Sequence, residues 1–136
     1  MSGLVWREDA DLSAANSLRL PCRARVLADA EDEDAVLEAF ARADDEGLAV
    51  HVLGGGSNVV LPPRIDAVIL RPAIRPVPAR PAAGLLEVPA GCDWDALVRR
   101  TTGAGLWGIE TLALVPGRVG AAPVQNIGAY GQELAE

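Results

Sequence analysis

Apolar residues recur at helical spacing in residues 31–47, at Val36, Leu37, Phe40 and Ala43. The segment opens with four acidic residues, 31–34, which complement the positive end of a helix dipole. Gly47 stands where a C-terminal cap is expected. The pattern predicts a helix here and makes the acidic run part of its first turn rather than a metal site.

A second helix is predicted after residue 93. Asp93 suits the N-cap position, Trp94, Leu97 and Val98 share one helical face, and Gly103 ends the pattern. The segments 24–28, 67–70 and 85–88 have the short β-branched or apolar character of strands. Residues 48–53 form a near-continuous apolar run bounded by glycines, which predicts a buried strand, with His51 as a structural residue inside it. Residues 6–16 show neither period and are expected to be irregular.

The middle of the chain, from residue 72 to residue 81, is rich in proline, which excludes a central strand or a helix interior there. We therefore expect a junction, with one subdomain over residues 1–72 and another over 73–136. Both helices and strands are predicted in each part. The segment 105–131 is rich in glycine and is expected to be held by packing or by a ligand.

Composition excludes several functions. The chain of 136 residues has a net charge of −7, which argues against duplex nucleic acid as a partner. It has no run of about 20 apolar residues that could span a membrane, and its charged start is unlike a signal peptide, so a cytoplasmic location is expected. All basic residues are arginine, which excludes a P-loop or Schiff-base lysine. Cys22 and Cys92 are expected to be reduced, and no metal site is expected.

The first segment with chemical content is Gly54, Gly55, Gly56, Ser57 and Asn58, directly after the predicted strand. Three glycines let the backbone take positive φ and turn consecutive amides toward an anion such as a pyrophosphate. The dinucleotide fingerprint G-x-G-x-x-G is a poor alternative, because Val59 replaces its third glycine and Pro62 follows closely. A plain tight turn stays open at this point.

The second segment runs from residue 108 to residue 134. Its small residues leave room for a large planar ligand against the backbone, and its side-chain and backbone amides could form hydrogen bonds with the polar edge of that ligand. The alternative is a tightly packed loop without a ligand. The candidate residues are Pro116, Gly117, Val119, Gly120, Ala122, Pro123, Gln125, Asn126, Gly128 and Ala129, followed by Tyr130.

These two segments together resemble the UDP-N-acetylenolpyruvoylglucosamine reductases, a family of cell-wall enzymes. The phrase from Pro116 to Gly131 is similar to the family signature, the Gly-Gly-Gly-Ser-Asn loop to its pyrophosphate loop, and residues 16–18 to its Asn-Thr-Phe-type opening. The resemblance implies an FAD-binding fold of the vanillyl-alcohol-oxidase and p-cresol-methylhydroxylase type, with two α+β subdomains, the second incomplete. It departs from the family at Arg118 and Ala121, where smaller or other residues are usual.

The resemblance also implies the chemistry. The amides of residues 54–57 would hold the FAD pyrophosphate with Asn58 supporting the loop, residues 116–130 would line the isoalloxazine and ribityl, and Tyr130 would contact a UDP-sugar substrate. NADPH would reduce FAD, which would then reduce the enolpyruvyl group in peptidoglycan precursor synthesis. The family's later catalytic residues have no counterpart here, so we expect no catalytic residue in this chain and no activity without the C-terminal portion. Another flavin oxidoreductase of this fold, or a non-catalytic flavin-binding module, are the alternatives.

Overall fold

The computed structural model describes residues 3–74 and 79–135. The chain divides into two compact units, Met1–Ile74 and Arg75–Glu136, which are described separately. Both helices and strands are present, so the predicted α+β class is confirmed. The assignment of each part as a flavin-binding subdomain stays a prediction.

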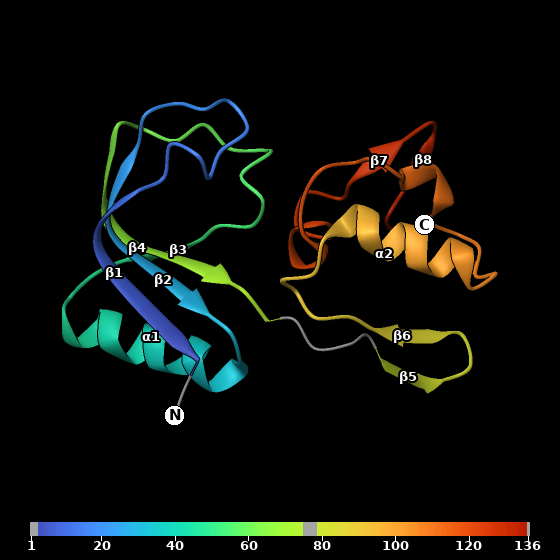
Figure 1. Ribbon diagram of the computed structural model, residues 1–136, viewed down its shortest axis with the longest axis horizontal. Coiled ribbons are helices and arrows are strands. Elements are labelled where there is room, and N and C mark those ends of the chain that lie inside the picture. Colours follow the sequence, from blue (N-terminus) through green and yellow to red (C-terminus); the bar gives the residue numbers. More distant parts are fainter. Residues whose placement is uncertain (1–2, 75–78, 136) are drawn as a thin grey trace. The chain divides into compact units, whose positions relative to one another are not determined.

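The first unit is built on a four-stranded sheet with the order β1-β2-β4-β3 (Figure 1). Its strands are β1 (Leu4–Asp11), β2 (Arg23–Ala30), β3 (Val50–Val52) and β4 (Arg64–Pro72). β1 is antiparallel to β2, whereas β2, β4 and β3 run parallel. The parallel strands therefore end at the same edge of the sheet, where the loop after β3 begins.

The helix α1 (Glu33–Asp45) covers one face of this sheet. Asp32 caps its N-terminus by accepting a hydrogen bond from the Ala35 amide at 2.7 Å, and Gly47 beyond its end has φ +64°. The helix is confirmed, but its predicted apolar face is wrong in part. The buried positions are Ala35, Ala39 and Ala43, while Leu37 and Phe40 are exposed. Alanine suits these buried positions because its small side chain lets the helix backbone lie close to the sheet.

Two strand predictions are also wrong. Residues 4–11 form β1 rather than an irregular opening, since the charged side chains of an edge strand can stay in solvent while Leu4, Trp6 and Ala10 are half-buried or buried. β3 lies at the edge of the sheet beside β4, and His51 and Val52 are exposed rather than buried. A continuous apolar run predicts a strand that is buried on both faces. In the structure, Val50 is half-buried and the two residues after it are exposed.

The opposite face of the sheet carries a second apolar cluster under the loops. Leu27 and Ile69 from the central strands pack there with Leu12, Cys22 and Leu53. Leu53 is the residue immediately before the glycine loop. This cluster therefore joins the sheet to the base of that loop.

The second unit is smaller and has more turns. It contains β5 (Ala79–Ala82), β6 (Leu85–Glu87), α2 (Trp94–Gly103), the 3₁₀ turns η1 (Glu110–Leu112) and η2 (Val119–Ala121), and the hairpin β7 (Gly128–Ala129) with β8 (Gln132–Glu133). Asp93 caps α2 as predicted, accepting from the Ala96 amide at 3.1 Å. The buried Trp94 donates its indole N–H to the Leu112 carbonyl at 2.9 Å, which fixes the turn-rich segment to the helix. Of the proline-rich stretch, residues 75–78 lie outside the described residues.

No described helix has the length and apolar character needed to cross a bilayer. The described residues also contain no cluster of three side chains suited to hold a metal ion. Cys22 and Cys92 are both free, and burial raises the pKa of the Cys22 thiol.

Candidate functional site

The glycine loop begins where β3 leaves the sheet. The Leu53 amide donates to the Leu70 carbonyl at 2.9 Å, so the chain is held to β4 up to the first glycine. Gly56 has φ +67°, a conformation that side chains disfavour. Gly54 and Gly55 do not have positive φ, so the expectation that all three glycines exploit this freedom is wrong.

Gly56 is required for a second reason, which is close packing. A Cβ atom built on it would lie 2.0 Å from the Ala15 carbonyl oxygen. The Gly56 carbonyl in turn accepts a hydrogen bond from the Ser17 amide at 2.9 Å. The loop is thus fixed against residues 15–17, which overlap the segment 16–18 that resembles the family's opening motif.

Asn16 holds that segment in place from inside the protein. It is 2% exposed, and its side-chain amide donates to the carbonyls of Leu12 and Leu20, each at 3.1 Å. Its side-chain oxygen accepts from the Leu20 amide at 3.0 Å. One buried side chain therefore closes the turn on which Gly56 packs.

The amide groups of the glycine loop are available to a ligand. Within residues 3–74 and 79–135, no acceptor is hydrogen-bonded to the amides of Gly54, Gly55 or Gly56. Ser57 is half-buried and Asn58 is exposed, and both make contacts within the structure. Because a backbone amide inside a protein normally has an acceptor, the half-buried Gly54 and the buried Gly56, with the exposed Gly55 between them, favour an anion site.

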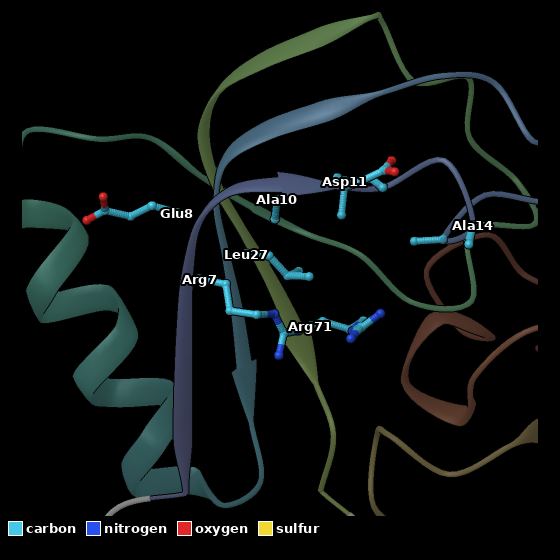
Figure 2. Close-up of a pocket in the computed structure, with 9 residues that line it drawn as sticks. Arg7, Glu8, Ala10, Asp11, Ala14, Leu27 and Arg71 are labelled. Carbon is cyan, nitrogen blue, oxygen red and sulfur yellow. The ribbon is translucent and has the colours of Figure 1, made fainter.

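A cavity of about 340 Å³ lies in the same unit, on the sheet face opposite α1 (Figure 2). The loop residues do not line it, but Ala15, which packs against Gly56, does. Its floor is apolar and includes Leu12 and Leu27, and one wall is formed by Ala14 and Ala15. Arg7 and Arg71 complete the lining, and Figure 2 shows Glu8 directed away from them. Ala15 thus contacts Gly56 and also lines the cavity.

The two arginines share one carboxylate. Arg71 donates to Asp29 through Nε at 2.5 Å and through Nη2 at 2.9 Å, and Arg7 donates to the same carboxylate. The Asp29 side chain is 14% exposed. Burial raises the pKa of Asp29, but the hydrogen bonds from Arg71 and Arg7 outweigh this effect, so its pKa lies below the ordinary value.

This lowered pKa makes a prediction about acid stability. Because the folded protein favours the Asp29 carboxylate, its contribution is complete above the unfolded pKa of about 4 and is lost as the pH falls through the lower folded value. We expect Asp29→Asn to lower the free energy of unfolding by about 1–2 kcal/mol at pH 7. The difference from wild type should shrink below about pH 4, which urea unfolding at several pH values would measure. A difference that grows on acidification would contradict the assignment.

In the second unit, the segment 117–120 is tied to the chain just before α2. The Gly117 carbonyl accepts from the Trp94 amide at 3.1 Å, the Val119 amide donates to Cys92 at 2.9 Å, and the Gly120 amide donates to Ala90 at 3.0 Å. A Cβ on Gly120 would lie 2.6 Å from the Ala90 Cβ. Gly120 therefore has a packing role of its own, and its contact with a flavin stays a prediction.

Arg118 departs from the resemblance and has a partner in this chain. Its guanidinium lies 3.9 Å from the Asp93 carboxylate, and both residues line a cavity of about 440 Å³ beside α2. The neighbouring Ala121 is half-buried, and Pro116 is exposed.

The remaining predicted residues divide between core and surface. Ala122 is buried with Ile127, while Pro123 and Val124 are exposed and Gln125 is half-buried. Asn126 donates to Glu133 at 2.8 Å and accepts from the Ala135 amide at 3.0 Å. The side chain of Asn126 thus has partners in this chain.

The hairpin that follows presents the tyrosine. Gly128 and Ala129 form β7, and Tyr130 and Gly131 link it to β8 with φ of +55° and +81°. Two successive positive φ values are typical of a type I′ turn. Tyr130 is 93% exposed at its tip, in a conformation that non-glycine residues rarely adopt.

The sequence analysis missed the arginine pair and its carboxylate. Arg7, Asp29 and Arg71 come from three different strands, and the pairing of Asp29 with Arg71 depends on the register of β2 against β4. It also missed Leu114, which has φ +65°, is exposed, and has its amide held by Asp95 at 2.8 Å. No local motif marks either arrangement.

Comparison with known proteins gives consistent results. The profile of a family described as an FAD binding domain matches residues 24–136. A UDP-N-acetylenolpyruvoylglucosamine reductase from Pseudomonas aeruginosa is 45% identical over 136 residues, covering 98% of this chain and 40% of that protein. One from Cupriavidus pinatubonensis is 48% identical over 124 residues, covering 89% of this chain and 37% of that protein.

A solved structure shares the fold. The crystal structure of UDP-N-acetylenolpyruvylglucosamine reductase from Thermus caldophilus superposes with a TM-score of 0.76 and 25% sequence identity, covering 99% of this chain and 46% of that one. The chain spans about 40% of the length of the sequence relatives named above.

Proposed function

The chain belongs to the FAD-binding domain family, and from that membership we propose that it forms the flavin-binding N-terminal portion of a UDP-N-acetylenolpyruvoylglucosamine reductase. The observation that carries the proposal is the glycine loop. Its three successive amides have no acceptor among the described residues, and Gly56 combines a positive φ with close packing against Ala15 that a side chain would prevent.

These residues fit the cofactor that the family name implies. A pyrophosphate carries oxygens on two adjacent groups, and consecutive amides of a glycine loop can bond several of them at once. The amides of residues 54–57 would hold the pyrophosphate with Asn58 supporting them. The flavin and ribityl would lie along Pro116, Gly117, Val119, Gly120, Ala122, Pro123, Gln125, Asn126, Gly128 and Ala129.

The reaction is proposed from the relatives. FAD supplies the redox chemistry, with NADPH as reductant and a UDP-sugar enolpyruvyl ether as substrate, in peptidoglycan precursor synthesis in the cytoplasm. The exposed Tyr130 would contact the UDP-sugar from the hairpin tip. We expect this portion of the enzyme to bind and orient FAD and the substrate and to leave proton delivery to other residues.

That last point follows from the polar site residues. Gln125 and Asn126 carry amides, which are poor proton donors, and Ser57 belongs to the phosphate loop. Tyr130 is assigned to substrate binding. We therefore expect the residues that protonate the reduced substrate to come from the remainder of the enzyme.

The proposal is tested by titrating the 136-residue polypeptide with FAD and following flavin fluorescence. We expect saturable binding of one FAD per chain that is weak enough for FAD to separate on gel filtration. We also expect no NADPH-dependent reduction of the UDP-sugar enolpyruvyl ether by this polypeptide alone. Absence of saturable FAD binding would contradict the flavin assignment, and reductase turnover would contradict the expected division of labour.

A further inference from the structure

The glycine loop holds no charged side chain, although a bound FAD pyrophosphate carries two negative charges. The chain as a whole has a net charge of −7, so it does not attract anions by its overall field. Residues 54–58 can supply only amide and hydroxyl donors. A cationic side chain nearby would therefore contribute strongly to phosphate affinity.

Arg71 lies at the same sheet edge as the start of this loop. It follows Leu70, whose carbonyl accepts the amide of Leu53, the residue before the first glycine. Its side chain lines the cavity whose wall at Ala15 also contacts Gly56. Parallel strands commonly present ligand sites beyond their carboxyl ends, and Arg71 is near that end of β4.

Asp29 orients Arg71 without using all of its donors. The carboxylate accepts from Nε and Nη2, which leaves the Nη1 group and a second Nη2 hydrogen of a five-donor guanidinium. The Arg71 side chain is 36% exposed, so these donors can reach a ligand in the cavity. Because Arg7 binds the same carboxylate, two positive charges meet one negative charge at this point.

Two carboxylates also belong to the cavity lining. Hydrogen bonds from the hydroxyl and amide of Ser13 lower the pKa of Asp11, so this residue stays negatively charged, but Figure 2 shows its side chain directed away from Arg7 and Arg71. Glu8 is directed away from the arginines as well. An anion that binds beside Arg7 and Arg71 would therefore face neither carboxylate.

We propose that Arg71, positioned by Asp29 and assisted by Arg7, is a phosphate-binding residue that holds the diphosphate of FAD together with the amides of the glycine loop. The proposal rests on the proposed function for the identity of the ligand. The phosphate-binding role of Arg71 does not depend on that identity, since any diphosphate group suits a guanidinium that is fixed in orientation and accessible on one side.

The test compares Arg71→Gln with Arg64→Gln. Both residues are on β4 and both substitutions remove one positive charge, but Arg64 is at the other end of the strand, where it lies 3.7 Å from Asp9. Fluorescence titration should show FAD affinity reduced about tenfold or more in Arg71→Gln and changed less than about twofold in Arg64→Gln. The decrease of FAD affinity with added salt should also be less steep in Arg71→Gln.

Further measurements separate the possible failures. Circular dichroism and thermal unfolding check that each variant folds. If Arg71→Gln does not fold, Arg71→Lys replaces it in the comparison. Lysine keeps the positive charge but lacks the two-pronged guanidinium, so the FAD affinity of Arg71→Lys should lie between that of wild type and tenfold weaker binding. Equal FAD affinity in wild type and a folded Arg71→Gln would overturn the proposal. If wild type binds no FAD, the proposed function fails instead. Calorimetric titration with inorganic pyrophosphate then tests Arg71 directly, and equal heats in both proteins would overturn its role.

Discussion

Replacing Gly56 by alanine is expected to destabilise the first unit by on the order of 3–5 kcal/mol and to reduce FAD affinity more than tenfold. The left-handed conformation at φ +67° alone costs a non-glycine residue about 1–2 kcal/mol. The added Cβ would lie 2.0 Å from the Ala15 oxygen, a backbone atom that cannot rotate away. The loop must therefore move, and its amides leave the positions in which they face an anion.

Two other glycines provide matched controls for this variant. Gly47 has a similar φ of +64° but nothing within 4 Å of a built Cβ, so Gly47→Ala measures the conformational cost without the clash. Gly55→Ala changes the same loop at a position without positive φ. Urea unfolding should rank Gly56→Ala well below both. Equal losses for Gly56→Ala and Gly47→Ala would show that the contact with Ala15 is unimportant.

Removing the Asn16 side chain is the second large expected effect. Asn16→Ala leaves the Leu12 and Leu20 carbonyls and the Leu20 amide without their buried partner. Each unsatisfied buried group costs about 1–3 kcal/mol, so a total of on the order of 3–5 kcal/mol is expected. FAD affinity should fall as well, because the turn that Asn16 closes also donates the Ser17 amide to Gly56.

Asn16→Asp and Ser17→Ala refine the interpretation. An aspartate keeps the size and can accept from the Leu20 amide, but it cannot donate to the two carbonyls, so it should be destabilising too. Ser17 is exposed, and alanine there keeps the backbone amide that bonds Gly56, so its stability and FAD affinity should be near those of wild type. A stable Asn16→Ala protein would mean that water or a rearranged turn replaces these bonds.

The sequence predicts well those features that depend on local chemistry. The α2 helix cap at Asp93 and the glycine beyond α1 follow from rules about helix ends that hold whatever the rest of the fold does. The central strand β4 is predicted because its apolar run is buried. The glycine loop follows a strand as the sequence predicts, and its role as an anion site stays a prediction. Only the structure shows that Gly56 is the residue that needs to be glycine for conformation and packing.

Features that depend on strand pairing could not be predicted in this way. β1 has too many charged residues to show a clear alternation, and it becomes a strand because its partner β2 supplies the hydrogen bonds. The pairing of Asp29 with Arg71 requires residues 42 positions apart to meet. Nothing in the local sequence of Arg71 distinguishes it from Arg64, which lies on the same strand and faces a different carboxylate.

The alanine face of α1 acts as a spacer of fixed length. Ala35, Ala39 and Ala43 contribute little apolar area, but they have no side-chain rotamers to lose on folding, so the contact costs no side-chain entropy. It also offers no freedom to adjust, because a methyl group cannot turn aside to admit a larger neighbour. The distance between the helix and the sheet is thus set by backbone and Cβ atoms alone. The helix therefore supports the parallel strands rigidly on the sheet face away from the cavity.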